Sequence, residues 1–329
     1  LDLWGRLRNQ AAAGDAQAQA SDDDLAAARL SLQKQLAMLY VQLNGLDAQS
    51  RILSRSLEDY AQALQLTRDR YQGQIASQLD LTRAQSQLAS AEAELDEVRA
   101  QRNLTEHAIG ELVGEPASRF SLAPSTQLLS LPDIPQQLPS TLLQRRPDIA
   151  AAERRVYAAN AGIGIARAAW YPDFSLTGML GGQTQGVGNL LAAGNRYWAL
   201  GPLVNLPIFD GGRLSANERQ AHAEFEEAAA HYRGQVLRAV REVEDNLGQL
   251  RDLRQEALDQ QAAVNAAQHT QTLAMNSYQA GAVSYLDVVT AQNAALQAQR
   301  GLQAVQTREL QASVGLLVAL GGGESAASL

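Results

Sequence analysis

The stretch YQGQIASQLDLTRAQ at residues 71–85 decides the fold, because it returns as YQAGAVSYLDVVTAQ at residues 278–292 with seven identities and no gap. The same offset of 207 residues maps residues 5–7 onto residues 212–214, where GRL recurs. A repeat that keeps its register over such a distance indicates two copies of one structural unit.

Each copy has the pattern of a helical hairpin. On both sides of the quoted stretch, apolar residues recur in steps of three and four, which is typical of helices packed as in a coiled coil. A helix from about residue 15 to residue 72 would be roughly 87 Å long at 1.5 Å per residue, so the hairpins must pack side by side. A generic structural coiled coil is the alternative. The clearest series is Leu32, Leu36, Leu39, Leu43, Leu46, Leu53, Leu57, Tyr60 and Leu64.

Composition excludes several classes of function. A net charge of -8 and a pI near 5.1 leave no basic face for nucleic acid. The chain has no cysteine, so neither a disulfide nor a thiolate metal site is possible within it. We find no nucleophile with a neighbouring base, so we expect no catalytic residue, metal or cofactor. The four histidines lie at no metal-binding spacing: His107, His222, His231 and His269.

The segment between the two copies begins with a connector. Residues 115–146 contain five prolines and predict a stretch without a long helix. A helix starts at the RRPD motif, where Pro147 suits the first turn and Asp148 suits the positive end of the helix dipole. This helix ends before Trp170.

Two strands of period two follow, one from Phe174 to Leu180 and one from Trp198 to Leu206. Each has close to the length that crosses an outer membrane obliquely, with aromatic residues at its ends. No apolar run is long enough for a spanning helix, so any membrane span must use strands. A soluble strand pair buried by the helices is the alternative. Two strands cannot close a barrel, so a membrane role requires oligomerisation. The predicted loop contains Gly186, Gly188, Asn189, Gly194 and Asn195.

Together with the paired YQ turns, four motifs resemble the TolC/OprM family of outer-membrane efflux proteins, in its multidrug lipoprotein (NodT-like) branch. They are LDLWGRLRN (1–9), LPSTLLQRRPDIAAAERRVYAANAGIGIARAAWYPDFSLTG (138–178), LPIFDGGRL (206–214) and LLVALGGG (316–323). The resemblance implies a mainly α fold with a small β part: long helical hairpins that form an α-barrel, and transmembrane β-barrel strands, assembled as a homotrimer. It also implies that this chain begins near the end of the family's second strand, with any lipid-bearing cysteine lying before it.

The expected organisation follows from the repeat and the resemblance together. It comprises a first hairpin repeat of the periplasmic α-barrel (1–114), an equatorial connector (115–146), a helix leading to the barrel (147–170), two transmembrane strands with an extracellular loop (171–209), a second hairpin repeat (210–322) and a C-terminal tail (323–329).

The resemblance further implies a passive exit channel in the bacterial outer membrane, with helices in the periplasm, and not an enzyme. Its partners would be a periplasmic adaptor (membrane fusion protein) and, through it, an RND-type inner-membrane pump of a tripartite multidrug efflux system. Two other functions remain open at this stage: a soluble periplasmic adaptor or scaffold built on helical hairpins, and a TolC-like channel for protein secretion.

The two turns hold the sharpest candidate residues. Ser77 with Asp80, and Ser284 with Asp287, form Ser-x-x-Asp capping boxes that start the returning helices. The resemblance places the second turn at the periplasmic mouth, where symmetry would gather three Asp287 carboxylates with Asp80 nearby. Clustered carboxylates favour cations.

The resemblance also assigns Tyr278 to a hydrogen-bonded lock and Leu286 to an apolar constriction. Val283 stands where well-known relatives carry arginine, and Thr290 where they carry a second aspartate, so we expect a less ionic lock. Small turn residues would admit an adaptor's tip, or simply permit tight turns: Gly73, Ser77, Gly281 and Ser284. A membrane girdle would comprise Trp170, Tyr171, Phe174, Tyr197 and Trp198.

Overall fold

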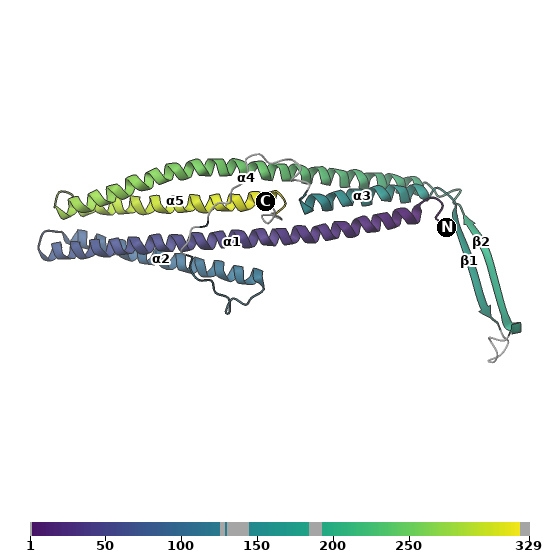
Figure 1. Cartoon of the computed structure of the whole chain (residues 1–329), viewed down its shortest axis with the longest axis horizontal. Helices are drawn as coiled ribbons and strands as arrows, with labels where there is room; N and C mark the ends of the chain where they lie inside the picture. The colour runs from purple at the N-terminus through teal and green to yellow at the C-terminus, as the bar shows by residue number, and fades with distance from the viewer. Residues whose placement is uncertain (1, 126–128, 130–144, 184–192, 323–329) are drawn as a thin grey trace, which may run out of the picture. The chain divides into compact units, whose positions relative to one another are not determined.

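The computed structural model describes residues 2–125, 129, 145–183 and 193–322. The tail 323–329, most of the connector, and Gly186, Gly188 and Asn189 of the predicted loop lie outside these residues. The elements, labelled in Figure 1, are α1 (Arg6–Gln72), α2 (Gln78–Val113), α3 (Pro147–Ala168), β1 (Asp173–Gly182), η2 (Ala193–Asn195), β2 (Arg196–Asn205), α4 (Arg213–Gln279) and α5 (Tyr285–Ala319).

The helices confirm the predicted repeat. Helices α1 and α4 each have 67 residues, and their bounds differ by the 207 residues of the sequence offset. Helix α1 starts at Arg6, earlier than the predicted start near residue 15. The Asp2 carboxylate accepts the backbone N–H groups of Leu7 and Arg8 at 3.0 Å each, which satisfies two donors that a helix start leaves open.

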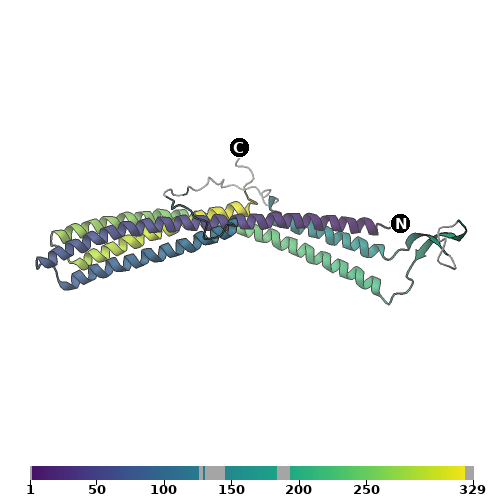
Figure 2. The same cartoon turned by 90° about the horizontal axis from the view of Figure 1, so that it is seen from below.

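The chain divides into two compact units. The first comprises the described parts of 1–28 and 140–239, and therefore contains α3, the strand pair and the N-terminal parts of α1 and α4. The second comprises the described parts of 29–139 and 240–329, with α2, α5 and the rest of α1 and α4. Both views of this second unit show its four helices running side by side toward the two turns (Figures 1 and 2).

Three apolar clusters form the core of the second unit, and burying each large aliphatic side chain in them contributes about 1.5–3 kcal/mol. The cluster nearest the turns draws on all four helices through Ala63, Ala84, Tyr278, Tyr285 and Val288. The next joins the first hairpin to α5 through Leu53, Tyr60, Ala91, Leu95, Val98 and Leu296. The third lies within the second hairpin and contains Leu250, Leu253, Val305, Ala312 and Leu316.

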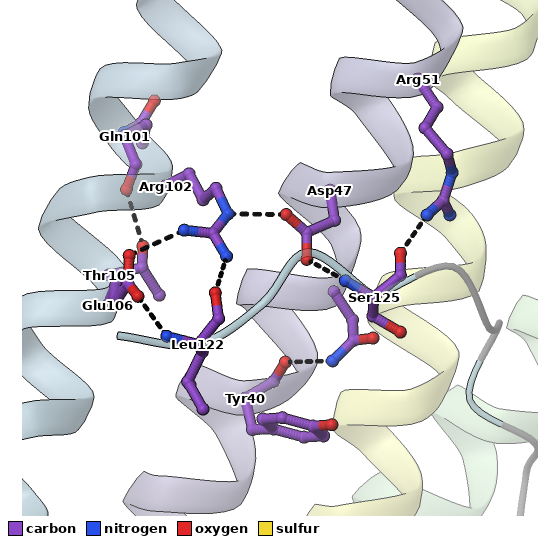
Figure 3. A network of polar contacts seen from close by, with 10 residues as sticks. Tyr40, Asp47, Arg51, Gln101, Arg102, Thr105, Glu106, Leu122 and Ser125 are labelled. Atoms are coloured by element: carbon purple, nitrogen blue, oxygen red, sulfur yellow. Dashed lines mark hydrogen bonds and ion pairs between the residues drawn. The ribbon is translucent and has the colours of Figure 1, made fainter. Parts of the chain in front are cut away.

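A buried ion network ties the start of the connector to the first hairpin (Figure 3). Arg102 donates to Asp47 and to Glu106 at 2.7 Å each, and to the Leu122 carbonyl at 2.6 Å. The same carboxylates accept backbone N–H groups in return, Glu106 from Leu122 and Asp47 from Ser125. Burial raises the pKa of Glu106, but the Leu122 N–H and the Arg102 guanidinium outweigh it and hold that pKa below its ordinary value. Glu106 is therefore ionised at neutral pH.

The second hairpin carries the same interhelical ion pair with its charges exchanged. The offset of 207 residues maps Asp47 onto Arg254 and Arg102 onto Glu309. Arg254 Nε lies 3.5 Å from Glu309 Oε1, so the pair has kept its place while the acid and the base have changed helices. Its arginine is 51% exposed, whereas the Arg102 side chain is 14% exposed.

The strand pair agrees with the predicted alternation. Strands β1 and β2 are antiparallel, and their register sets Leu176 opposite Pro202 and Leu180 opposite Trp198. These four residues therefore share one face of the strand pair, which is exposed: Leu180 is 84% and Trp198 76% accessible. Among the described helices, none has a segment of sufficient length and hydropathy to traverse a lipid bilayer.

Candidate functional site

The backbone of both turns closes in the same way. Helices α1 and α4 each end with a residue in the left-handed region two positions beyond the last helical residue, Gln74 (φ 59°) and Gly281 (φ 77°). The Ala282 N–H then donates to the Ser277 carbonyl at 2.8 Å, the bond of a Schellman cap. Gly281 thus corresponds to Gln74, and Gly73 precedes the left-handed position.

Both predicted capping boxes are present. The carboxylate of Asp80 accepts the Ser77 hydroxyl at 2.8 Å, and that of Asp287 accepts the Ser284 hydroxyl at 2.8 Å and its N–H at 3.0 Å. Arg83 Nη1 lies 3.7 Å from Asp80. Among the described residues, no basic group lies within 4.0 Å of Asp287. Asp287 therefore contributes a less compensated negative charge than Asp80.

Tyr278 lies inside the junction of the two hairpins. Its side chain is 4% exposed, and its hydroxyl donates to Thr67 of α1 at 3.3 Å. Its ring meets that of Tyr285 edge to face, with centroids 5.5 Å apart. Burial, with Tyr278, Tyr60 and Asp80 nearby, raises the pKa of Tyr285 to about 12, so the Tyr285 hydroxyl stays neutral at physiological pH.

Arg70, in the last turn of α1, is a functional candidate that the sequence did not reveal. Its Nη1 donates to the carbonyls of Tyr278 at 2.9 Å and Gln279 at 3.2 Å, and its guanidinium lies 4.8 Å from the centre of the Tyr278 ring. The available signal was a difference between the copies, because Ser277 stands at the corresponding position.

The other gate candidates lie on the exposed side of α5. Leu286 is 49% exposed, and Thr290 donates its hydroxyl to the Leu286 carbonyl at 2.8 Å. Leu286 and Thr290 therefore do not join the buried contact around Tyr278. In the first turn, Leu79 corresponds to Leu286 and is 58% exposed, and Ile75 beside it is 70% exposed. The turn end thus presents apolar tips above a buried aromatic junction.

The aromatic residues lie at both ends of the strand pair. Trp170 donates its indole N–H to Glu218 at 3.1 Å, and Tyr171 stacks on Trp4 with ring centroids 4.6 Å apart. Trp4 therefore packs against an aromatic residue that was predicted for the membrane girdle. Phe174 lies opposite Val204 near one end, whereas Trp198 lies opposite Leu180 near the other. Phe174 and Leu180 lie six positions apart along the chain, which corresponds to about 20 Å of strand.

At the loop end of the strand pair, Tyr197 lies across its partner Gly181. A Cβ added at Gly181 would meet the tyrosine ring at 2.7 Å, so only glycine leaves room for this ring. No group of three or more metal-ligating side chains comes together in the part of the chain that the structure describes.

Comparisons with known proteins agree with this geometry. The profile of the family "Outer membrane efflux protein" matches residues 1–115 and 138–322. Outer membrane protein OprJ of Pseudomonas aeruginosa is 34% identical over 325 residues, covering 98% of this chain and 68% of OprJ. The toluene efflux pump outer membrane protein TtgC of Pseudomonas putida is 31% identical over 327 residues, covering 98% of this chain and 67% of TtgC.

Solved structures give the same answer. The outer membrane protein VceC of Vibrio cholerae superimposes with a TM-score of 0.91 at 32% identity, covering 99% of this chain and 78% of that chain. CusC, described as forming a transmembrane channel, gives a TM-score of 0.93 at 28% identity over 98% of this chain and 76% of that one. With its paired helical hairpins and amphipathic strand pair, the chain belongs to the outer membrane efflux protein family.

Proposed function

We propose that this chain forms, as a homotrimer, the exit duct of a tripartite multidrug efflux pump and that its two turns form the periplasmic gate. The observation that carries the gate is the turn end itself. Each hairpin ends there in a capped turn, and the buried Tyr278 of the second hairpin contacts the first hairpin. Leu286 and Asp287 remain on the exposed side. Such an end can close by apolar contact and select by charge.

Asp287 carries the ion preference in this proposal. Its carboxylate is fixed by the Ser284 cap, and three copies around a threefold axis would concentrate negative potential at the mouth. Asp80 contributes less because Arg83 lies beside it. Leu286 forms the apolar constriction, and Thr290 supports the Leu286 backbone instead of adding a second carboxylate ring.

The proposed partners follow from the same arrangement. The exposed turns around Gly73, Ser77, Gly281 and Ser284 would receive a periplasmic adaptor, which would connect the duct to an RND-type inner-membrane pump. The exposed apolar face of the strand pair, with its aromatic ends, would contact outer-membrane lipid. Similar proteins are named for toluene efflux and pyoverdine export, which favours small-molecule cargo over secreted protein.

Recordings in planar bilayers test the gate. Asp287→Ala is expected to raise single-channel conductance or weaken cation preference, and Asp287→Asn, which keeps an acceptor for the cap, is expected to change ion selectivity in the same direction. Asp96→Ala is the matched control, because Asp96 is a 76% exposed carboxylate on the shaft of α2. Conductance and selectivity identical in Asp287→Asn, Asp287→Ala and Asp96→Ala would refute the gate.

A further inference from the structure

We infer that Arg70 is a one-way latch that holds the tip of the second hairpin against the first, a positioning role that rests on the proposed gate and deepens it. The latch consists of Arg70 and Thr67 on α1, which hold Tyr278 at the end of α4 from two sides. The backbone carbonyls of Tyr278 and Gln279 complete it.

Arg70 compensates the negative charge at the C-terminal end of helix α4. The last carbonyls of a helix lack intrahelical partners and carry the negative end of its dipole, so a cation there is stabilising. Helix α4 has no basic residue in its own last turn. Arg70 supplies the missing charge from the other hairpin, with one guanidinium nitrogen bridging two terminal carbonyls.

Arg70 also occupies the space beside the second turn. The Arg70 guanidinium lies between the Tyr278 ring and the turn, and a Cβ added at Gly281 would stand 3.7 Å from its Nη2. A longer side chain at Gly281 would compete for this space. The Arg70 Nε is buried and has no partner among the described residues, so the side chain is held by its terminal nitrogens and by the ring.

The second copy of the repeat lacks the residues for a reciprocal contact. If the two tips held one another reciprocally, Ser277 would clamp Tyr71 as Arg70 clamps Tyr278. Serine is too short to do so, and the position of Thr67 corresponds to Ala274, which has no hydroxyl. Tyr71 is accordingly 39% exposed. The contact therefore works in one direction, from the first hairpin onto the second.

The latch also supplies a positively charged side chain, which the second turn itself lacks. Val283, which is 37% exposed, has no charge to offer. Arg70 acts from the opposite hairpin and binds neutral carbonyls, and among the described residues no carboxylate lies within 4.0 Å of it. Moving the second hairpin away would break both hydrogen bonds and the ring contact together, so the latch favours the arrangement in which the two tips are held together.

Distances between the two tips test the latch. Because the chain has no cysteine, spin labels can be attached to Ile75→Cys and Ala282→Cys, which are equivalent exposed positions of the two turns. Labelled protein is assembled with an excess of the unlabelled parent, so that distances are measured within one chain. Arg70→Gln is expected to increase the population with separated tips roughly tenfold to a hundredfold, the range for a lost charged hydrogen bond.

The matched control is Arg68→Gln, which removes an exposed arginine two residues away that makes no hydrogen bond or ion pair with the described residues. Arg70→Lys keeps the charge but lacks the planar fork, so it is expected to be intermediate. In the Arg70→Gln background, Tyr278→Leu is expected to add little, because the two residues act as one contact.

A distance distribution in Arg70→Gln that matches Arg68→Gln would overturn the latch. If Arg70→Gln loses helical circular dichroism, Arg70→Lys decides: separated tips support the latch, and the parent distribution overturns it. This readout is independent of ion flow, so the latch can fail while Asp287 still sets selectivity, and the reverse.

Discussion

Removing Arg102 is expected to be among the most damaging single changes in the second unit. The Arg102→Met substitution deletes three hydrogen bonds of 2.6–2.7 Å and leaves Asp47 and Glu106, with side chains 4% and 10% exposed, without their cation. Breaking a buried ion pair from one side costs about 3–5 kcal/mol. That corresponds to a fall in the unfolding midpoint of roughly 6–20 °C.

The repeat provides the control for this prediction. Arg254→Met removes the corresponding arginine, which is 51% exposed and makes a single contact of 3.5 Å with Glu309, whose side chain is 10% exposed. Because Arg254 is largely solvated and makes one contact where Arg102 makes three hydrogen bonds, the expected cost is smaller than that of Arg102→Met. Thermal unfolding followed by circular dichroism at a fixed detergent concentration compares the two variants. Equal shifts of the midpoint, or a larger one for Arg254→Met, would show that burial and connector contacts do not set the strength of these pairs.

Three further predictions concern the same unit. The contribution of Glu106 to the free energy of unfolding is expected to be complete above the ordinary pKa of a glutamate and to be lost as pH falls through its lowered pKa. In a pH series of unfolding midpoints, Glu106→Gln should flatten this part of the curve. The Gln292 side chain is 2% exposed, and neither of its amide atoms has a hydrogen-bond partner among the described residues. Gln292→Leu should therefore raise the unfolding midpoint, whereas the same change at its exposed counterpart, Gln85→Leu, should not. A lower unfolding midpoint for Gln292→Leu would contradict this. At the left-handed position of the first turn, Gln74→Gly should stabilise by about 0.5–1 kcal/mol in chemical denaturation, and Gly281→Ala should destabilise; an opposite sign for either would exclude the backbone explanation.

The periodic parts of the fold could be predicted from the sequence. Heptad spacing located the hairpins, Ser-x-x-Asp located both caps, and alternation in residues 174–180 and 198–206 located the strands. These features depend on neighbours within a few positions along the chain, so a single sequence contains the necessary information.

Contacts between distant helices could not be predicted in the same way. Arg70 meets Tyr278 across 208 residues, and Arg102 meets Leu122 only because the connector folds back. Neither contact follows a period, because each depends on how helices and connector pack. The two copies do differ at both places, where Arg70 aligns with Ser277 and Arg102 with Glu309, but other arginines such as Arg83, which aligns with Thr290, differ as well, so the difference alone marks neither contact.

The exchanged ion pairs bear on how a chain with two similar hairpins folds correctly. If α1 paired with α5 in place of α2, Asp47 would face Glu309, and if α4 paired with α2, Arg254 would face Arg102. Each mispaired hairpin would bring two like charges together, whereas each native hairpin joins opposite ones. The reversed polarity therefore favours pairing of each long helix with the returning helix of its own copy. It disfavours hairpins that combine helices of different copies, both within one chain and between neighbouring chains during assembly.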